Sequence, residues 1–251
     1  MKKLIPLIVF NFILLTAFSQ IVNIERERYQ TDTTGWKGNL DVGLAIGKQT
    51  KTYFVFSTSA HVQYKSKKHL YLLLGSADLL KTKAEDLVNA GFLHFRYNYK
   101  LKKNWVRWEA FTQVQFNKAN GLRLRFLIGT GPRFKLVQKE KFKTYIGALY
   151  MYEHEVNIKK TEKLDQVRFS GYLSFSLRPF KQLEFISTTY YQPNVTQIKD
   201  FRISTDNSMN IRFHKNVTFA INFRMNYDSR PPIGAVTNLT YLQSNTLKVD
   251  F

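Results

Sequence analysis

From residue 36 onward, apolar and polar side chains alternate along the chain. In residues 93–99, four apolar or aromatic residues alternate with His94, Arg96 and Asn98. The other clear examples are residues 36–46, 106–116, 122–134 and 217–225. Strand side chains point alternately to the two faces of a sheet, and segments of about ten residues with one apolar and one polar face are typical of transmembrane β-strands.

The segments between these predicted strands fall into two kinds. One kind is very short and basic: residues 65–68, 100–104, 138–141, 178–182 and 214–216. The other is more variable and holds most of the acids: residues 47–51, 80–86, 117–120, 154–166, 193–199 and 228–236. Short turns on one side and longer loops on the other predict an all-β fold, a transmembrane antiparallel up-and-down β-barrel of about twelve strands. Residues 69–80 are the least regular strand, because neither face is uniformly apolar.

A soluble two-sheet sandwich is the structural alternative, since it also alternates. The predicted strands are longer than the roughly 5–6 residues usual in globular proteins. Tyr and Trp gather at strand ends, as they do in the interfacial girdles of membrane proteins. The last strand ends in Leu247, Val249 and Phe251, each separated by a polar residue. We therefore expect a membrane barrel.

The first residues predict export. Lys2 and Lys3 precede an apolar run over residues 4–18, and Ala17 and Ser19 supply small residues at the positions that signal peptidase reads. We predict a signal peptide over residues 1–19 cleaved before Gln20, a periplasmic lead-in over residues 20–35 and the barrel over residues 36–251. The lead-in either plugs the lumen or hangs free. The apolar run is short for a transmembrane helix, which needs about 20 residues.

The chain is strongly basic, with 38 Lys and Arg against 18 Asp and Glu and a formal net charge of +20. It shows none of the common nucleic-acid motifs, so we expect no nucleic-acid partner. Outer-membrane lipids are the predicted partner, with the basic turns at the head-group level. The chain has no Cys, which excludes thiol catalysis and thiolate metal sites.

The predicted inner face carries a set of basic side chains. If the apolar face of residues 122–134 meets lipid, then Arg123, Arg125, Arg133 and Lys135 point into the lumen. Arg96, Arg107 and Arg168 fall on polar faces of other predicted strands. A basic constriction favours the passage or binding of anions. The alternative is that these charges pair with acids such as Glu109 and Glu153 and plug the lumen. A twelve-stranded barrel is smaller than the roughly 16–18 strands that leave a wide channel, which favours a narrow lumen.

An outer-membrane lipid hydrolase is the enzymatic alternative. Ser59 and His61 share one strand face, but the sequence identifies no third member of a catalytic triad. The five His residues are scattered, so we expect no metal site and no cofactor. Gly129–Pro132 lacks the spacing of a phosphate loop. We therefore predict no enzymatic activity and no catalytic residues.

A resemblance to a known family is carried by residues 36–38, 67–71, 91–101, 107–111, 126–134, 149–153, 187–193 and 228–232. In these stretches the chain resembles an uncharacterised outer-membrane β-barrel family, a domain of unknown function sometimes called salt-induced outer-membrane proteins, in the version found in Bacteroidetes-type bacteria. The resemblance implies a barrel in the outer membrane and no accepted activity. It also implies that the barrel-assembly machinery recognises the strand ending in Phe251.

Together these patterns predict a non-enzymatic barrel with a narrow basic lumen. Its expected role is structural support of the envelope, adaptation to stress or passage of small anions. A contact role at the cell surface would fall on the loop over residues 154–166. The sequence identifies no soluble partner.

Overall fold

The computed structural model describes residues 34–48, 52–82, 86–118, 120–159, 163–214, 216–231 and 237–249. These residues form twelve strands and no helix. The strands are β1 (Gly35–Lys48), β2 (Thr52–Lys65), β3 (His69–Thr82), β4 (Asp86–Lys100), β5 (Val106–Asn117), β6 (Leu122–Gln138), β7 (Phe142–Asn157), β8 (Lys163–Phe180), β9 (Leu183–Pro193), β10 (Phe201–His214), β11 (Val217–Asp228) and β12 (Leu239–Val249).

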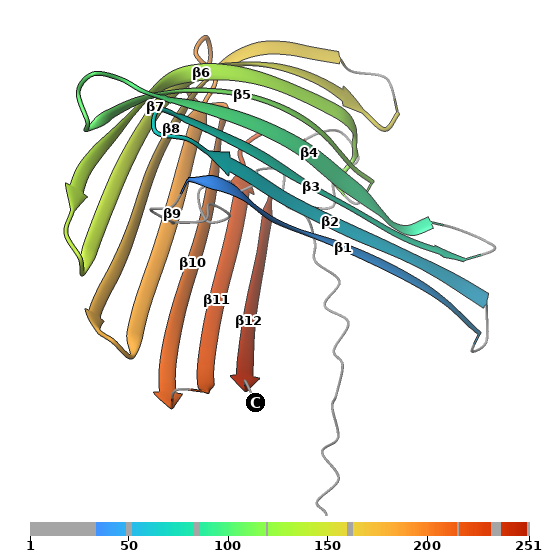
Figure 1. The fold of residues 1–251 in the computed structure, drawn as a ribbon. Coiled ribbons are helices and arrows are strands. Elements are labelled where there is room, and N and C mark those ends of the chain that lie inside the picture. Colours follow the sequence, from blue (N-terminus) through green and yellow to red (C-terminus); the bar gives the residue numbers. More distant parts are fainter. Residues whose placement is uncertain are drawn as a thin grey trace, which may run out of the picture.

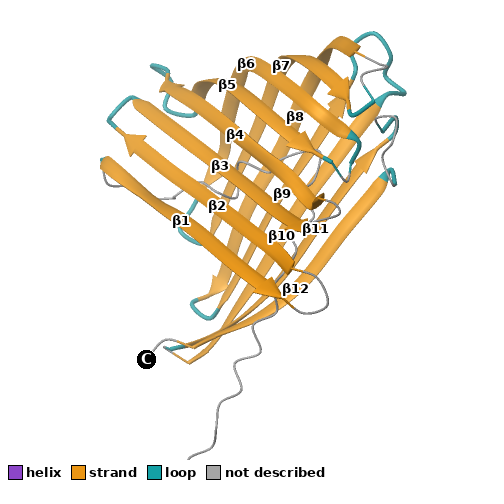
Figure 2. Ribbon diagram, turned by 90° about the vertical axis from the view of Figure 1, so that its right-hand side faces the viewer, coloured by secondary structure: helices purple, strands orange, loops and turns teal. Residues whose placement is uncertain are grey.

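All twelve strands belong to one sheet, and each strand pairs antiparallel with its neighbours in sequence. The sheet curls about the interior, most strongly from β5 to β12, and its strands are tilted (Figures 1 and 2). The ladders found among the described residues run from β1–β2 to β11–β12 and include none between β1 and β12. The predicted all-β, antiparallel up-and-down fold of about twelve strands is confirmed.

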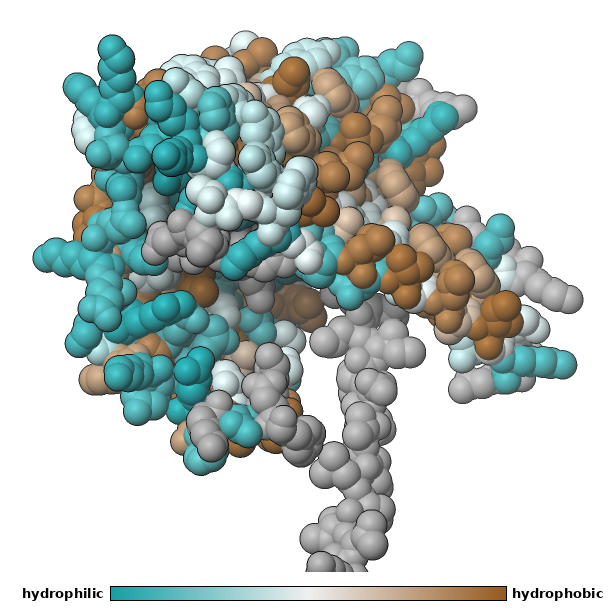
Figure 3. Space-filling model, in the orientation of Figure 1, coloured by the Kyte–Doolittle hydropathy of each residue, from teal (hydrophilic) through white to brown (hydrophobic). Residues whose placement is uncertain are grey.

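The connections lie on two opposite rims. Short turns join β2–β3, β4–β5, β6–β7, β8–β9 and β10–β11, and we call this end the turn-side rim. The remaining connections form the loop-side rim. Hydrophilic side chains line the edge where the turns lie (Figure 3).

The outer face of the sheet is apolar. Leu93 and Phe95 of β4 are 55% and 39% exposed, whereas the alternating His94 and Arg96 are buried. Apolar side chains form a band over β1–β4 (Figure 3). An outward apolar face without a protein partner is typical of strands that face lipid.

Aromatic side chains mark both ends of this apolar face. On the turn side, Trp36, Tyr64, Tyr71 and Tyr97 occupy directly paired positions on β1 to β4, with ring centroids 4.9, 6.2 and 5.1 Å apart along the row. On the loop side, the Phe201 ring of β10 lies within 5.8 Å of the rings of its neighbours Tyr191 and Tyr227. Such rows are typical of the two interfaces of a membrane.

One expectation about an element is wrong, and the least regular strand is confirmed. The predicted loop over residues 154–166 is shorter, because His154 pairs with Asp165 and Val156 with Lys163 in the β7–β8 ladder. Residues 69–80 do form a strand, and its irregular pattern arises because Leu70, Leu72 and Leu74 turn inward while Tyr71 and Leu73 face outward.

Several expectations fall outside the described residues. The signal peptide, its cleavage before Gln20, nearly all of the lead-in and the terminal Phe251 belong to this part of the chain. Among the described residues, no helix is long and apolar enough to cross a membrane.

Candidate functional site

A buried network of ion pairs fills the interior near the loop-side rim. At its centre is Glu153 of β7, whose side chain is fully buried. It accepts from Arg125 of β6 at 2.7 Å, from Arg168 of β8 at 2.7 Å and from Arg202 of β10 at 2.5 Å. Glu155, two residues further along β7, bonds to Arg125 at 2.5 Å and Arg202 at 3.1 Å. Because residues two apart share a strand face, both carboxylates reach the same arginines.

Two further carboxylates complete this network. Arg168 Nη2 donates to Asp200 in the β9–β10 connection at 2.8 Å, and Arg202 Nε donates to Asp228 at the end of β11 at 2.7 Å. The set therefore holds three arginines and four carboxylates, which we call the loop-side network. Every charge in it is paired, as charges buried away from water must be.

The loop-side network crosses the interior rather than following the wall. Arg202 lies on β10 and Glu153 on β7, so β8 and β9 separate their strands in the sheet. Contacts between strands that are not neighbours can form only where the curled sheet brings its inner faces together. At this level side-chain ion pairs join strands across the interior, in addition to the backbone ladders between neighbouring strands.

A second network lies closer to the turns. Glu109 of β5 is fully buried and pairs with Arg96 of β4 at 3.4 Å and with Arg133 of β6 at 3.6 Å. It also accepts from Asn98 and, at 2.8 Å, from the hydroxyl of Tyr172 on β8. The bond between Glu109 and Tyr172 again joins strands that are not neighbours. We call this set the turn-side network.

An apolar layer separates the two networks. It consists of Phe111, Leu127, Leu149, Met151, Tyr172 and Tyr190. Glycine allows these large rings to fit, because a Cβ on Gly147 would overlap the Tyr172 ring and one on Gly129 would overlap the Phe111 ring. A glycine on the inner face therefore leaves room for the ring of a neighbouring strand at these positions.

Positive charges line up at the level of the turn-side network. Lys100 on β4 pairs directly with Arg107 on β5, and Arg107 pairs directly with Arg133 on β6. Like charges placed opposite one another on neighbouring strands are destabilising. Arg133 is compensated by Glu109 and by the Tyr145 ring, 4.2 Å from its guanidinium carbon. The row therefore places three positive side chains at directly paired positions on β4, β5 and β6.

The basic residues predicted for the lumen are not all in equivalent places. Arg96, Arg125 and Arg133 are buried on the inner face, and Lys135 is half-buried, with its ammonium group bonded to Gln138. Arg123 is exposed, contrary to the expectation. The reason is a register shift between Leu122 and Leu124, which inserts one extra residue into β6 and turns Leu122 inward.

Sequence reasoning missed four members of the loop-side network: Glu155, Asp200, Arg202 and Asp228. Glu155, Asp200 and Asp228 lie at or near segments expected to be loops, and Arg202 follows one of them. A signal was available for Glu155, because Leu149, Met151 and Glu153 place it on the inner face if β7 is extended by two residues.

Ser59 and His61 lie on one face of β2, as expected for the hydrolase alternative. The Ser59 hydroxyl, however, donates to the Asp41 carboxylate of β1 at 3.0 Å. A serine nucleophile needs a base that accepts its proton and is itself oriented by a third group. Nothing here favours hydrolysis. Among the described residues, no group of His, Asp and Glu is arranged to hold a metal.

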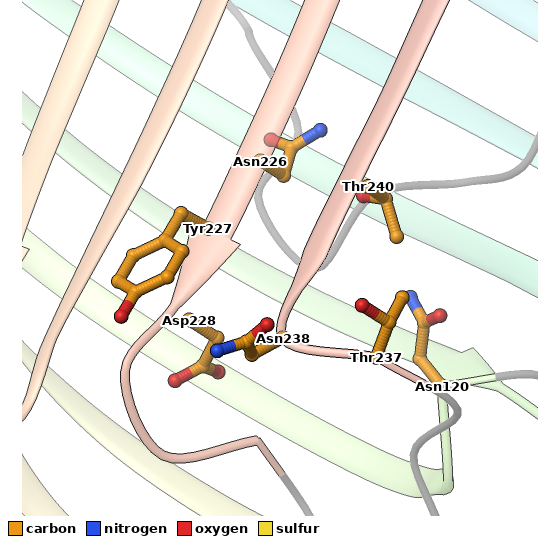
Figure 4. A pocket seen from close by; sticks show the side chains of 7 residues that line it. All are labelled: Asn120, Asn226, Tyr227, Asp228, Thr237, Asn238 and Thr240. Carbon is orange, nitrogen blue, oxygen red and sulfur yellow. The ribbon is translucent and has the colours of Figure 1, made fainter.

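The loop-side mouth is crossed by polar side chains. Asn120, from the β5–β6 connection, meets the facing ends of β11 and β12 around a small pocket (Figure 4). Its other lining residues are Asn226, Tyr227, Asp228, Thr237, Asn238 and Thr240. With a volume of about 10 Å³, the pocket has room for about one water and for no larger solute.

Comparison with known protein families identifies the family of this chain. Residues 40–251 match the family described as "Protein of unknown function, DUF481". The chain belongs to the DUF481 family. The match spans β2 to β12 and most of β1, so it covers both networks. The predicted resemblance to an uncharacterised outer-membrane barrel family is confirmed.

Solved structures show which fold this DUF481 member shares. A porin named NanC superposes with a TM-score of 0.50 at 8% sequence identity, over 85% of this chain and 100% of that chain. A structure described as a bacterial polysaccharide outer membrane secretin gives a TM-score of 0.47 at 9% identity, over 86% of each chain. At such low identity, the likeness to the porin shows the barrel fold alone. No curated protein sequence matches the chain.

Proposed function

We propose that the protein is a non-enzymatic barrel of the outer membrane whose narrow, basic interior binds or passes only small anions. In this proposal the chain is exported by a signal peptide cleaved before Gln20. The barrel then supports the envelope, including under stress.

The observation that carries the proposal is the row formed by Lys100, Arg107 and Arg133. Three like charges in adjacent cross-strand positions reduce the stability of the sheet. A barrel wall that needed only to fold would do better with neutral or alternating charges there. A row of positive charges on the inner face attracts anions and repels cations, as rings of Arg and Lys do in anion pores.

The two networks support the narrow part of the proposal. The Arg202–Glu153 and Tyr172–Glu109 contacts both cross the interior, and the apolar layer lies between them. These contacts fill the interior beside β5 to β10. In this proposal, an ion path runs along the inner face of β1–β3, where most side chains of β2 are partly buried. A path bounded in this way admits small ions and excludes larger solutes.

Conductance of the refolded mature barrel in a planar bilayer, measured under a salt gradient, tests the proposal. We expect small single-channel steps with a reversal potential that shows anion preference. The double variant Lys100→Gln/Arg107→Gln should move the reversal potential toward zero. The matched control Lys102→Gln/Lys103→Gln removes two charges from the exposed turn beside them and should leave it unchanged.

Three results would contradict anion passage. One is a folded barrel that never conducts, another is a preference for cations, and the third is an equal effect of both double variants. Large, unselective steps would contradict the narrow interior instead.

A further inference from the structure

A pocket opens at the turn-side rim beside the basic row. Its volume is about 160 Å³, several times the roughly 30 Å³ that a water molecule occupies in the liquid. It is lined by Lys65, Ser66, Lys67, Lys68, His69, Leu70, Asn98, Lys100 and Arg107. The pocket therefore lies between the β2–β3 turn and the turn-side ends of β4 and β5.

The residues that line the pocket are mainly basic. Five of the nine lining residues are Lys or Arg, and none is Asp or Glu. The carboxylate nearest in sequence on β5 is Glu109, which already binds Arg96, Arg133 and Tyr172. Several basic groups converging on a concave surface raise the local concentration of anions.

Hydrogen bonds fix the shape of the pocket. The backbone N–H of Ser66 donates to the His69 carbonyl at 2.8 Å, and the N–H of His69 donates back to Ser66 Oγ at 3.1 Å. The N–H of Lys100 donates to the Lys68 carbonyl at 2.8 Å, which ties this turn to the end of β4. The basic side chains thus project from a frame that is ordered before any ligand arrives, which lowers the entropic cost of binding.

We propose that this pocket binds a phosphate group. Lys ammonium groups bind phosphate as point charges, and Arg adds the planar pair of donors that matches two phosphate oxygens. The inference deepens the proposed function and rests on its binding part alone, because it assigns the class of anion bound at this end of the lumen and requires no conduction. The phosphate has two possible sources: a free phosphate ion or ester entering from the turn side, and the head group of an anionic phospholipid.

The aromatic row on the outer face bears on the second source. His69 lines the pocket, and its ring lies 5.9 Å from that of Tyr97 and 6.4 Å from that of Tyr71. Both tyrosines belong to the turn-side aromatic row, and such rows lie at the level of the lipid head groups. The pocket is therefore within reach of the head groups as well as of the aqueous side.

Phosphorus NMR of the refolded full-length mature barrel tests the proposal with two probes. Inorganic phosphate is titrated into the protein in an uncharged detergent. Separately, the protein is placed in bicelles of phosphatidylcholine with a minor share of phosphatidylglycerol. We expect a saturable shift or broadening with at least one probe. Lys67→Ala/Lys68→Ala should weaken this binding by about 30-fold, since each basic residue near an anionic surface contributes about 1 kcal/mol.

The control variant Lys102→Ala/Lys103→Ala removes the same charge from the neighbouring β4–β5 turn, outside the pocket. The unfolding midpoints of both double variants in urea, compared with that of the parent protein, test whether the variants fold. A response to inorganic phosphate assigns the pocket to soluble phosphates, and a response to phosphatidylglycerol alone assigns it to the head group. No response to either probe overturns the proposal, as does equal weakening by the two double variants. A silent bilayer experiment would leave this result unaffected.

Discussion

At the scale of single residues, Glu153 is the residue on which the loop-side network depends. Its carboxylate is fully buried and binds the guanidinium groups of Arg125, Arg168 and Arg202. A buried ion pair adds little net stability compared with a well-packed apolar pair, but removing one partner leaves an uncompensated buried charge. Glu153 is the partner that all three arginines share.

We therefore expect Glu153→Ala to lower the free energy of unfolding by about 3–5 kcal/mol. Urea titration of the barrel refolded in lipid vesicles, followed by tryptophan fluorescence, measures this change. Glu140→Ala is the matched control, because Glu140 is exposed in the β6–β7 turn and its loss should change stability by no more than about 0.5 kcal/mol. Equal effects of the two variants would mean that the loop-side network contributes nothing specific.

At the scale of elements, β6 shows how a bulge decides which side chains enter the lumen. Simple alternation places Arg123 and Arg125 on the same inner face. The extra residue between Leu122 and Leu124 puts Arg125 in the loop-side network and leaves Arg123 exposed. The two arginines, two residues apart on one strand, therefore have different roles.

This difference gives a direct comparison. Arg125→Ala should lower the free energy of unfolding by about 3–5 kcal/mol, because Glu153 and Glu155 both lose a partner. Arg123→Ala should stay within about 0.5 kcal/mol of the parent protein. The same urea titration measures both variants. If Arg123→Ala were as destabilising as Arg125→Ala, the bulge would not set the register at this end of β6.

The elements also show what the sequence can and cannot predict. Period-two alternation predicted the paired strands well where both faces are clean, as in β4 and β5. It also placed β3 correctly but gave no clean face there, because Leu70, Leu72 and Leu74 line the inner face of a barrel whose interior is partly apolar. It failed at the ends of β7 and β8, because acidic side chains there were assigned to a loop. Alternation gives the face of a residue but cannot show a bulge or a partner three strands away.

At the scale of the whole molecule, charge is distributed unevenly along the lumen. The loop-side network pairs three arginines with four carboxylates, whereas in the turn-side network Glu109 contacts Arg96 and Arg133, and Lys100, Arg107 and the pocket lysines lie at the same end of the lumen. The two halves should respond differently to salt. Buried pairs are screened little, while exposed charges are screened over about 8–10 Å at physiological ionic strength.

We expect the unfolding midpoint to change little between about 0.1 and 1 M NaCl, because the buried pairs lie out of reach of the screening ions. Over the same range, phosphate binding at the turn-side pocket should weaken steadily. Urea titration and phosphorus NMR on the same samples measure the two quantities. A stability that fell in parallel with phosphate binding would show that the loop-side network is open to solvent.

The contacts that cross the interior help to set the shape of the barrel in cross-section. Strand number and stagger set the circumference of a closed sheet, but they leave its cross-section free to be round or flattened. Here the span from β7 to β10 equals the combined reach of one glutamate and one arginine, and the span from β5 to β8 equals that of a glutamate and a tyrosine. β1 to β3 form the flatter part of the sheet (Figure 1). The reach of a few inward side chains thus sets the profile of this barrel, so relatives with the same twelve strands and shorter or longer inner pairs would enclose differently shaped interiors.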